Sequence, residues 1–383
     1  MLSKIRKIYH ISYLRLTMAS RFKTLIKRIG LLLGILIILF SSFLIFISLK
    51  DYDPPDFMPL AFNQTNVSQI EDDTTLSIIT WNLGYAGLGK EMDFFYDGGK
   101  QVRASEKLSL KYFQNNLSFI EKMDSIDFWF FQEVDQHSKR SYFVDQIQKL
   151  TESLDKYNSA TAINYSVSWV PVPILNPLGK VEAGLMSFSK YTPIEASRYA
   201  YPNIASWPDN LFLLDRCFIL TRFLLPNNKH LVLLNTHNSY YVTNDSLRKI
   251  ELDIIREKMR EEFNEGNYVI AGGDWNRLPA GFNKFFRGDL SNLQKSIPSF
   301  SEDFLPSEWQ WAFDTHQFTN RELNLPYDEL ETKKSSIDYF IVSPNIELNE
   351  NFVFPLDFEN SDHNPVYLKF RLKDFNIRKT DLL

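Results

Sequence analysis

The stretch YVIAGGDWN, from Tyr268 to Asn276, is the part of the sequence that best indicates the fold. It opens with four apolar residues, as expected for a strand that is covered on both faces of a sheet. The candidate strand is Tyr268–Gly272, and Asp274 and Asn276 follow it. They are two residues apart and in extended backbone would project to the same side. The stretch therefore predicts a buried strand with polar side chains where it ends.

Short apolar segments separated by polar turns recur on both sides of this stretch. The other candidate strands are Leu76–Leu83, Ile126–Val134, Gly184–Ser189, Cys217–Leu225, Leu231–Thr236, Ile337–Val342 and Pro365–Arg371. Between two of them, residues 247–263 place apolar side chains along one face of an expected helix. Many strands with helices between them predict an α/β sandwich in one domain.

Most of these strands also end in, or contain, polar side chains. The motifs are Trp81-Asn82, Gln132-Glu133, Asn235-Thr236-His237, Gly273-Asp274-Trp275-Asn276, Ile337-Asp338-Tyr339 and Ser361-Asp362-His363-Asn364-Pro365. A single strand-end acid is more often a cap than a ligand, and burying Asp338 in a strand is costly unless it is paired. Together, however, the carboxylate and amide oxygens suit Mg²⁺ or Mn²⁺, and two histidines suit proton transfer near neutral pH.

In this order, the six motifs resemble the signature of the endonuclease/exonuclease/phosphatase superfamily over about residues 75–372. The resemblance implies a four-layered αββα sandwich with the active site at one edge of the packed sheets. It also implies hydrolysis of a phosphoester by in-line attack of water. Glu133 then corresponds to the principal metal ligand, with Asn82 and Asp362 beside it.

The remaining roles follow from the same resemblance. Asp274 and Asn276 correspond to the pair that positions the water and the phosphoryl group. His363, paired with Asp338, corresponds to the general base, because a carboxylate can hold an imidazole in one tautomer. His237 corresponds to a second histidine that binds the scissile phosphate or protonates the leaving oxygen.

Two segments depart from the better-known members of the superfamily. One is the Gly- and aromatic-rich region of residues 84–99, and the other is a loop that contains Trp169, Pro171, Pro173 and Pro177. Both resemble a membrane-associated bacterial branch that is distantly similar to hydrolase-like domains of GPI-anchor lipid remodelling proteins. The aromatic loops form either a lipid-facing rim or ordinary loop packing. Lys180, Arg216 and the pair Lys139-Arg140 are candidate phosphate contacts, or else solvated surface charges.

The N-terminal region predicts a membrane anchor. Residues 29–49 contain no charged side chain and as a helix would span roughly 30 Å, the thickness of a hydrocarbon core. A cleaved signal peptide is the alternative, but no small-x-small cleavage site follows. Residues 1–28 carry eight Lys and Arg and no acid, so they should stay in the cytoplasm and place the rest of the chain outside it. Met1 or Met18 could be the translation start.

The rest of the chain is acidic. The whole sequence has a net charge of −5, so residues 29–383 carry −13. Because nucleic-acid binding is chiefly electrostatic, long nucleic acid is a poor candidate partner, and a membrane-associated small or lipid phosphoester is favoured. The expected organisation is a linker at 50–74, a catalytic domain at 75–372 and a tail at 373–383. An extracytoplasmic nuclease and a non-catalytic surface protein are the alternatives.

Overall fold

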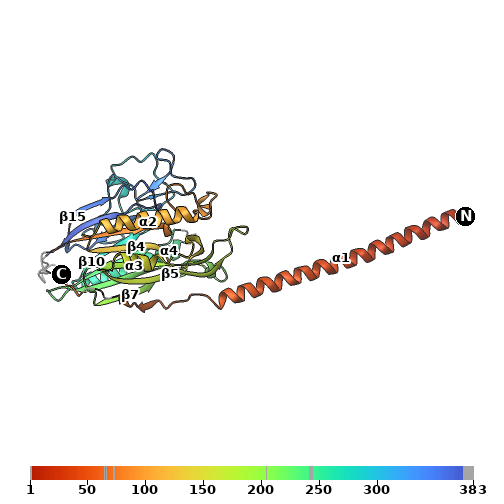
Figure 1. Ribbon diagram of the computed structural model, residues 1–383, viewed down its shortest axis with the longest axis horizontal. Coiled ribbons are helices and arrows are strands. Elements are labelled where there is room, and N and C mark those ends of the chain that lie inside the picture. Colours follow the sequence, from red (N-terminus) through yellow and green to blue (C-terminus); the bar gives the residue numbers. More distant parts are fainter. Residues whose placement is uncertain are drawn as a thin grey trace. The chain divides into compact units, whose positions relative to one another are not determined.

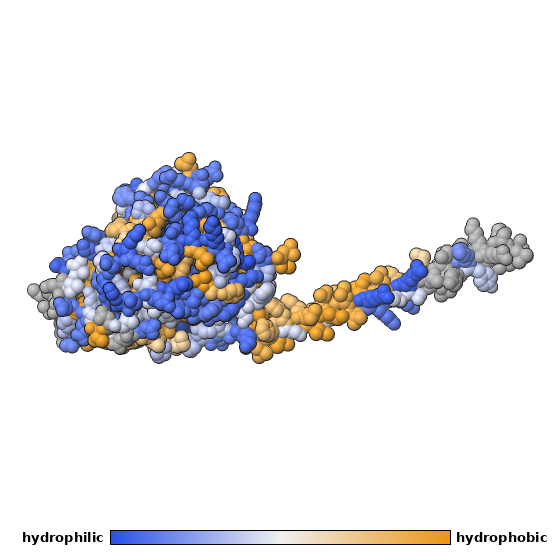
Figure 2. Space-filling view, in the orientation of Figure 1, coloured by the Kyte–Doolittle hydropathy of each residue, from blue (hydrophilic) through white to orange (hydrophobic). Residues whose placement is uncertain are grey.

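The computed structural model describes residues 2–63, 65, 67–71, 74–203, 205–240 and 245–373 (Figure 1). The chain divides into two units, Met1–Asp51 and Tyr52–Leu383. Helix α1 (Leu2–Ser48) makes up nearly all of the first unit. Its Ser20–Ser48 part is long and apolar enough to cross a membrane, a property that a signal sequence shares, and Figure 2 shows its hydrophobic surface.

Two seven-stranded sheets form the frame of the second unit. Their strand orders are β1-β7-β8-β9-β10-β14-β11 and β15-β16-β3-β4-β6-β5-β2. The first sheet contains β1 (Phe57–Pro59), β7 (Glu195–Ala200), β8 (Cys217–Leu224), β9 (His230–His237), β10 (Tyr268–Asp274), β14 (Asp338–Val342) and β11 (Gln310–Ala312). The second contains β15 (Ile346–Val353), β16 (Val366–Leu372), β3 (Thr75–Asn82), β4 (Phe128–Asp135), β6 (Gly179–Ser189), β5 (Asn158–Val170) and β2 (Phe62–Asn63). A separate ribbon pairs β12 (Asn320–Arg321) with β13 (Lys334–Ser335).

The two sheets pack face to face, because alternate side chains of their strands enter one shared core. Ile78 and Phe130 of the second sheet belong to the same buried cluster as Leu233 and Ile270 of the first. Ile79, the neighbour of Ile78, points the opposite way, to a cluster with α2 (Glu106–Lys122) and α3 (Gln146–Ser153). Strands that are apolar at successive positions are therefore buried on both faces, as their composition predicted.

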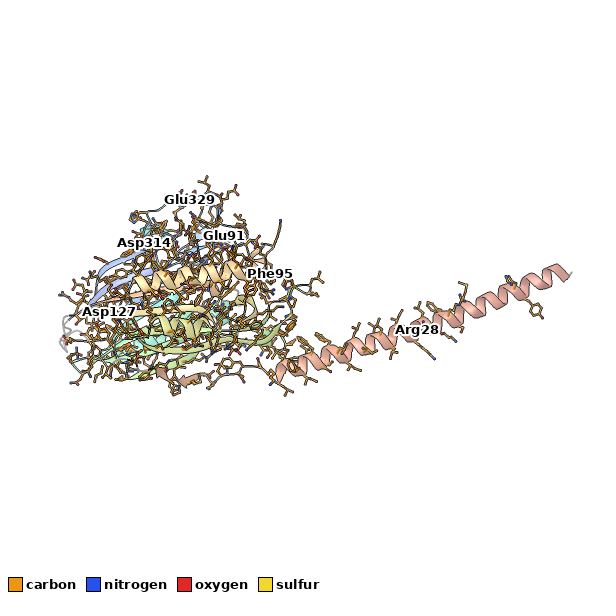
Figure 3. The ribbon with its side chains drawn as sticks, viewed as in Figure 1. Arg28, Glu91, Phe95, Asp127, Asp314 and Glu329 are labelled. Carbon is orange, nitrogen blue, oxygen red and sulfur yellow. The ribbon has the colours of Figure 1, made fainter. Side chains whose placement is uncertain are left out.

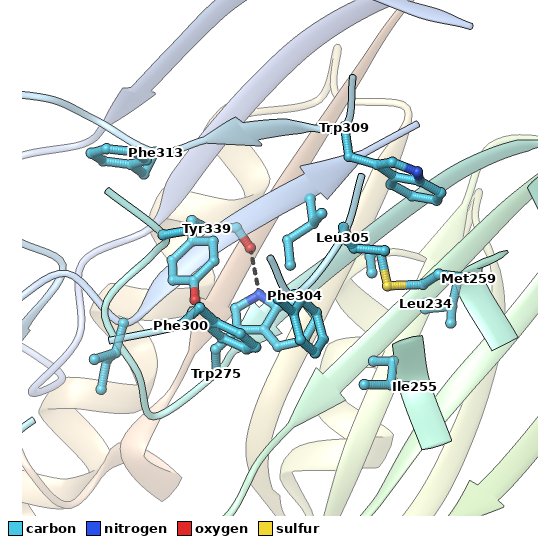
Figure 4. Close-up of a cluster of buried hydrophobic side chains, with 14 of the residues drawn as sticks. Leu234, Ile255, Met259, Trp275, Phe300, Phe304, Leu305, Trp309, Phe313 and Tyr339 are labelled. Carbon is cyan, nitrogen blue, oxygen red and sulfur yellow. Dashed lines mark hydrogen bonds between the residues drawn. The ribbon is translucent and has the colours of Figure 1, made fainter. Parts of the chain in front are cut away.

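The outer face of the first sheet is covered by α4 (Asp245–Asn264) and by the loops after β10. Ile255 and Met259 of the helix pack on Leu234 of the sheet (Figure 4). Trp275 stacks on Tyr339, and its Nε1 donates a hydrogen bond to the Tyr339 carbonyl oxygen over 3.1 Å. Helix, sheet, sheet and helix therefore form four layers, which confirms the αββα sandwich expected from the motif resemblance.

The region between α1 and β3 differs from the linker expected at residues 50–74. Within it, β1 pairs with β7 and β2 pairs with β5. These residues extend both sheets, and only a few residues separate α1 from the first strand. The short helix α5 (Phe282–Phe285) and three 3-10 turns before β5 and one before β8 complete the unit. Most of the expected tail at 373–383 lies outside the described residues.

Candidate active site

Strand register brings three of the predicted site residues into one row across the first sheet. In the parallel pair β9–β10, His237 lies opposite Asp274, and in the antiparallel pair β10–β14, Asp274 lies opposite Asp338. In the second sheet, β3 runs parallel to β4 so that Asn82 lies opposite Gln132. Because the two sheets face each other, the ends of these strands meet at one edge of the sandwich.

Asp274 lies at the centre of this arrangement. Its Oδ2 is 3.0 Å from the Asn82 side-chain nitrogen, which comes from the other sheet, and 3.5 Å from Nε2 of His237. Nε2 of His363 lies 3.8 Å from the same oxygen. The other oxygen, Oδ1, accepts a hydrogen bond from the backbone nitrogen of Asn276 over 2.9 Å. Burial raises the pKa of the Asp274 carboxyl to about 7.

His363 and Asp338 form a buried pair next to this carboxylate. Nδ1 of His363 lies 2.8 Å from Oδ2 of Asp338, and the Asp338 side chain is fully buried. Burial opposes the charged imidazole, but Asp338 and then Asp362 raise the pKa of His363 well above its ordinary value. The pair has the geometry by which a carboxylate fixes the tautomer of a catalytic imidazole.

Asn320, on the β12–β13 ribbon, contacts the other nitrogen of this imidazole. Its amide nitrogen lies 3.0 Å from Nε2 of His363 and 3.3 Å from the Asp362 carbonyl oxygen. That carbonyl fixes the orientation of the amide, because only the NH₂ group can donate to it. Nε2 then accepts a hydrogen bond and Nδ1 carries the proton toward Asp338. The sequence analysis missed Asn320, because its strand has two residues and no apolar pattern.

The predicted metal ligands come from the second sheet. Glu133 sits where the pairing of β4 with β6 is interrupted between Phe131 and Val134, and its φ is +53°. Such a bulge re-aims side chains, and here the Glu133 carboxylate lines the site with a quarter of its side chain exposed. Asn82 donates to its Oε1 over 3.3 Å.

The donor set fits a hard divalent cation. Burial, helped by the nearby Glu133, raises the pKa of the Asp362 carboxyl to about 6. Carboxylates that are crowded in a dry site in this way are stabilised by positive charge. Glu133 and Asp362 are carboxylate ligands that Mg²⁺ or Mn²⁺ accepts. The Asn82 oxygen accepts a hydrogen bond from the Gly84 nitrogen over 2.9 Å, and the Asn82 nitrogen faces Glu133 and Asp274. The structure also brings Asp274, Asp338 and His363 within ligand distance of one another, but the Asp338–His363 hydrogen bond already occupies two of those atoms.

The second histidine has the opposite electrostatic environment. Burial and the cationic Arg216 lower the pKa of His237 well below its ordinary value. The imidazole is therefore neutral, and its Nε2 is 3.8 Å from Glu133 Oε1. The side-chain nitrogen of Asn276 donates a hydrogen bond to the Asn238 carbonyl oxygen over 2.8 Å, which fixes the Asn276 side chain.

The candidate phosphate contacts have different outcomes. Arg216 lines the pocket, where its guanidinium donates to the His237 carbonyl oxygen over 3.3 Å. Lys180 does not line it, and its Nζ pairs instead with Glu182 over 2.7 Å. Arg140, from the candidate pair Lys139-Arg140, is buried and lines the pocket. Asp135 holds its guanidinium through two nitrogens, and the Tyr85 ring lies 3.7 Å from it.

These groups surround one pocket of about 550 Å³. Glu133, His237, Asp274, Asn276, Asp362 and His363 line it, while Asn82 and Asp338 support them from behind. The other wall is largely apolar and aromatic. It consists of Tyr85, Leu88, Phe94, Tyr96, Tyr165, Leu178, Phe212, Leu213, Leu214 and Leu323. The pocket therefore joins an acidic, imidazole-containing end to a wall that suits an apolar group.

Comparison with solved structures identifies the fold. An endonuclease/exonuclease/phosphatase from Beutenbergia cavernae DSM 12333 is 17% identical, with a TM-score of 0.51 over 78% of this chain and 72% of that one. ANGEL2, a 2′,3′-cyclic phosphatase, is 13% identical, with a TM-score of 0.50 over 82% of this chain and 98% of that one. No protein-family profile and no curated protein sequence matches the chain. The chain has the endonuclease/exonuclease/phosphatase fold, as its motifs predicted.

Proposed function

We propose that this chain is a divalent-metal-dependent phosphoesterase, held at a membrane by α1, that hydrolyses a phosphodiester or phosphomonoester such as a lipid headgroup. The observation that carries the proposal is the His363–Asp338 pair. Its hydrogen bond of 2.8 Å leaves Nε2 at a pocket that Asp274 and Glu133 also line. A dyad of this kind beside clustered carboxylates is the equipment for activating water.

In the proposed reaction, water takes the place of the Asn320 amide at Nε2 of His363, and this nitrogen takes a proton from the water while the water oxygen attacks phosphorus. The bond from phosphorus to the leaving oxygen then breaks. Asp338 stabilises the imidazolium that forms, and Asp274 with Asn276 orients the water and the phosphoryl group. His237 and Arg216 face the same space from β9 and the loop before β8. A cation held by Asn82, Glu133 and Asp362 would neutralise charge on the phosphoryl oxygens.

The walls of the pocket support a small or lipid substrate over a polynucleotide. Apolar and aromatic side chains form one side, whereas a nucleic-acid path needs a cationic groove. Three arginines, Arg140, Arg216 and Arg321, line the pocket itself, but Arg321 donates to backbone carbonyls and the chain after residue 28 is strongly acidic. A non-catalytic surface protein has no physical need for so many clustered acids and histidines, which argues against that alternative.

A substrate screen with the purified full-length chain tests this proposal. We expect hydrolysis of phospholipid headgroups or small phosphoesters such as bis-p-nitrophenyl phosphate with Mg²⁺ or Mn²⁺, and loss of activity in EDTA. A control variant, Glu359→Gln, changes an exposed acid that pairs with Lys90, and it should keep the activity of the unmodified chain. Cleavage of DNA in preference to these substrates would support the nuclease alternative. No turnover of any substrate would leave only the non-catalytic one.

The topology of α1 is a separate prediction. Because basic residues precede its apolar part, a reporter fused after Leu383 should be active only outside the cytoplasm. Protease added to spheroplasts should remove the second unit and leave the N-terminus protected. N-terminal sequencing of the membrane-bound protein distinguishes an anchor from a cleaved signal. A C-terminal reporter that is active in the cytoplasm would contradict the extracytoplasmic placement.

A further inference from the structure

The hairpin that joins β5 to β6 ends in an apolar tip, residues Trp169–Pro177. At its end, Leu175 is 99% exposed and Ile174 is 87% exposed. The turn is nonetheless ordered by its own backbone, since Asn176 donates to the Pro173 carbonyl and Leu178 to the Val172 carbonyl, each over 3.0 Å. Figure 2 shows a hydrophobic projection at this end of the domain. Two adjacent, fully solvated aliphatic side chains on a held turn are typical of a contact surface.

The base of the same hairpin is continuous with the candidate active site. Val167, Val170 and Val181 form a buried cluster with Leu178, against which Tyr165, Phe212 and Phe95 pack. Three members of this group, Tyr165, Leu178 and Phe212, also line the pocket. In Figure 3, Phe95 lies at the end of the domain opposite Asp127, which precedes β4. Buried apolar side chains therefore connect the hairpin to the pocket wall, where Tyr165 and Phe212 are half-buried.

The second unit begins at this same end. The Ala200 nitrogen at the end of β7 donates to the Asp56 carbonyl over 2.7 Å, and Arg198 joins the carbonyls of Pro55 and Asp215. The neighbours of Asp215 in the chain, Leu214 and Arg216, line the pocket. Seven residue steps separate Ser48, the end of α1, from Pro55, and they span at most about 25 Å. A bilayer crossed by α1 would lie within that reach of the pocket end.

Two cationic side chains and one tryptophan lie next to the aliphatic residues of the tip. Lys139 lies 5.5 Å from the Trp169 ring centre and donates to the Pro177 carbonyl. Arg103 donates to Asn176 and to the same carbonyl. Trp169 is 41% exposed. This combination suits insertion into a lipid layer. Aliphatic side chains favour the acyl chains, indoles favour the interface and cations favour the headgroups.

We propose that the Trp169–Pro177 tip inserts into the surface of the lipid bilayer and turns the mouth of the pocket toward it. The membrane placement of the chain in this inference rests on the proposed function. A second copy of the chain is a poorer occupant, because a protruding turn with two aliphatic residues falls far short of the roughly 1,000 Å² that a specific protein interface needs. Lipid phosphoesters could then enter the pocket past its apolar wall without leaving the bilayer.

Site-specific fluorescence tests the insertion directly. The single natural cysteine, Cys217, is fully buried, so Leu175→Cys can be labelled alone with an environment-sensitive dye. The labelled full-length chain is reconstituted into phosphatidylcholine–phosphatidylglycerol vesicles. We expect blue-shifted emission and quenching by lipids that carry quenchers in the upper acyl chain. The matched control is Leu330→Cys, 83% exposed beside Glu329 on another part of the surface (Figure 3).

A tip label with the same emission and quenching as the Leu330→Cys label would overturn the proposal, provided that α1 is inserted. Alkaline-resistant association of the protein with vesicles reports that insertion separately. Failure of the association would overturn the membrane anchor on which the inference rests. Labelling of the wild-type chain gives the background from Cys217.

Activity measurements add a second readout. The variant Ile174→Asp/Leu175→Asp should lower turnover of a bilayer-embedded lipid phosphoester at least about tenfold, because two apolar side chains lose their burial. Turnover of a water-soluble phosphoester should stay unchanged, and Leu330→Asp should affect neither. Equal loss on both substrates would overturn the proposal. No turnover of either by the wild-type chain would instead contradict the phosphoesterase function, while the fluorescence result stands.

Discussion

Replacing Glu133 with glutamine is expected to remove metal-dependent activity while the chain still folds. The substitution keeps the size of the side chain and removes one negative charge from a pocket position that is a quarter exposed. Little packing is lost, but the cation loses its principal charged ligand. We expect turnover to fall by at least about 10³-fold, equivalent to about 4 kcal/mol of transition-state stabilisation.

The measurement does not depend on knowing the substrate. A ligand that binds only the folded chain stabilises it, by about 2.7 kcal/mol at a hundredfold excess over its Kd. Mn²⁺ or Mg²⁺ should therefore raise the melting temperature of the wild-type chain and leave Glu133→Gln unchanged. Glu182→Gln is the matched control, since its side chain is 26% exposed and pairs with Lys180 outside the pocket. A metal-induced shift that persists in Glu133→Gln would remove Glu133 from the ligand set.

Strands with apolar residues on both faces were predictable from sequence, and this explains why the fold could be anticipated. Residues 268–271, and Ile78 with Ile79 in the strand at 76–83, are apolar at successive positions because each strand lies between the shared core and an outer layer. β5 was missed because its polar and apolar residues alternate only in part, and β15 because it is an edge strand with polar side chains. The strands β1 and β2 have three and two residues, too few to show a period.

Site residues were predictable where they lie at the ends of long strands. They were harder to predict where only tertiary contacts bring them to the site. The parallel register of β9 and β10 sets His237 beside Asp274, and both motifs were visible in the sequence. Asn320 reaches His363 only because the β12–β13 ribbon folds over the start of β16. The burial of Arg140 depends on Asp135 and Tyr85, whose positions no local pattern shows. Lys180 looked similar in sequence and pairs away from the pocket.

The largest coupled effect should come from His363 and Asp338. Either His363→Ala or Asp338→Ala should lower turnover by about 10²–10⁴-fold, because the imidazole takes the proton from water and the carboxylate presents the correct nitrogen. Substrate binding should change much less. The double variant should be little worse than His363→Ala alone, within about threefold, because both residues serve a single proton transfer.

If Asp338 has only a structural role, different results are expected. The unmodified chain, the two single variants and the double variant distinguish the two cases. Its Oδ1 is a buried atom without a hydrogen-bond partner, so a purely structural Asp338 would already be costly to the fold. In that case Asp338→Ala would change mainly the melting temperature, and the folded fraction would keep near-normal turnover. Losses in the double variant would then multiply. Thermal melts with single-turnover rates decide between the two, and multiplicative losses would leave His363 as a base without Asp338 as its partner.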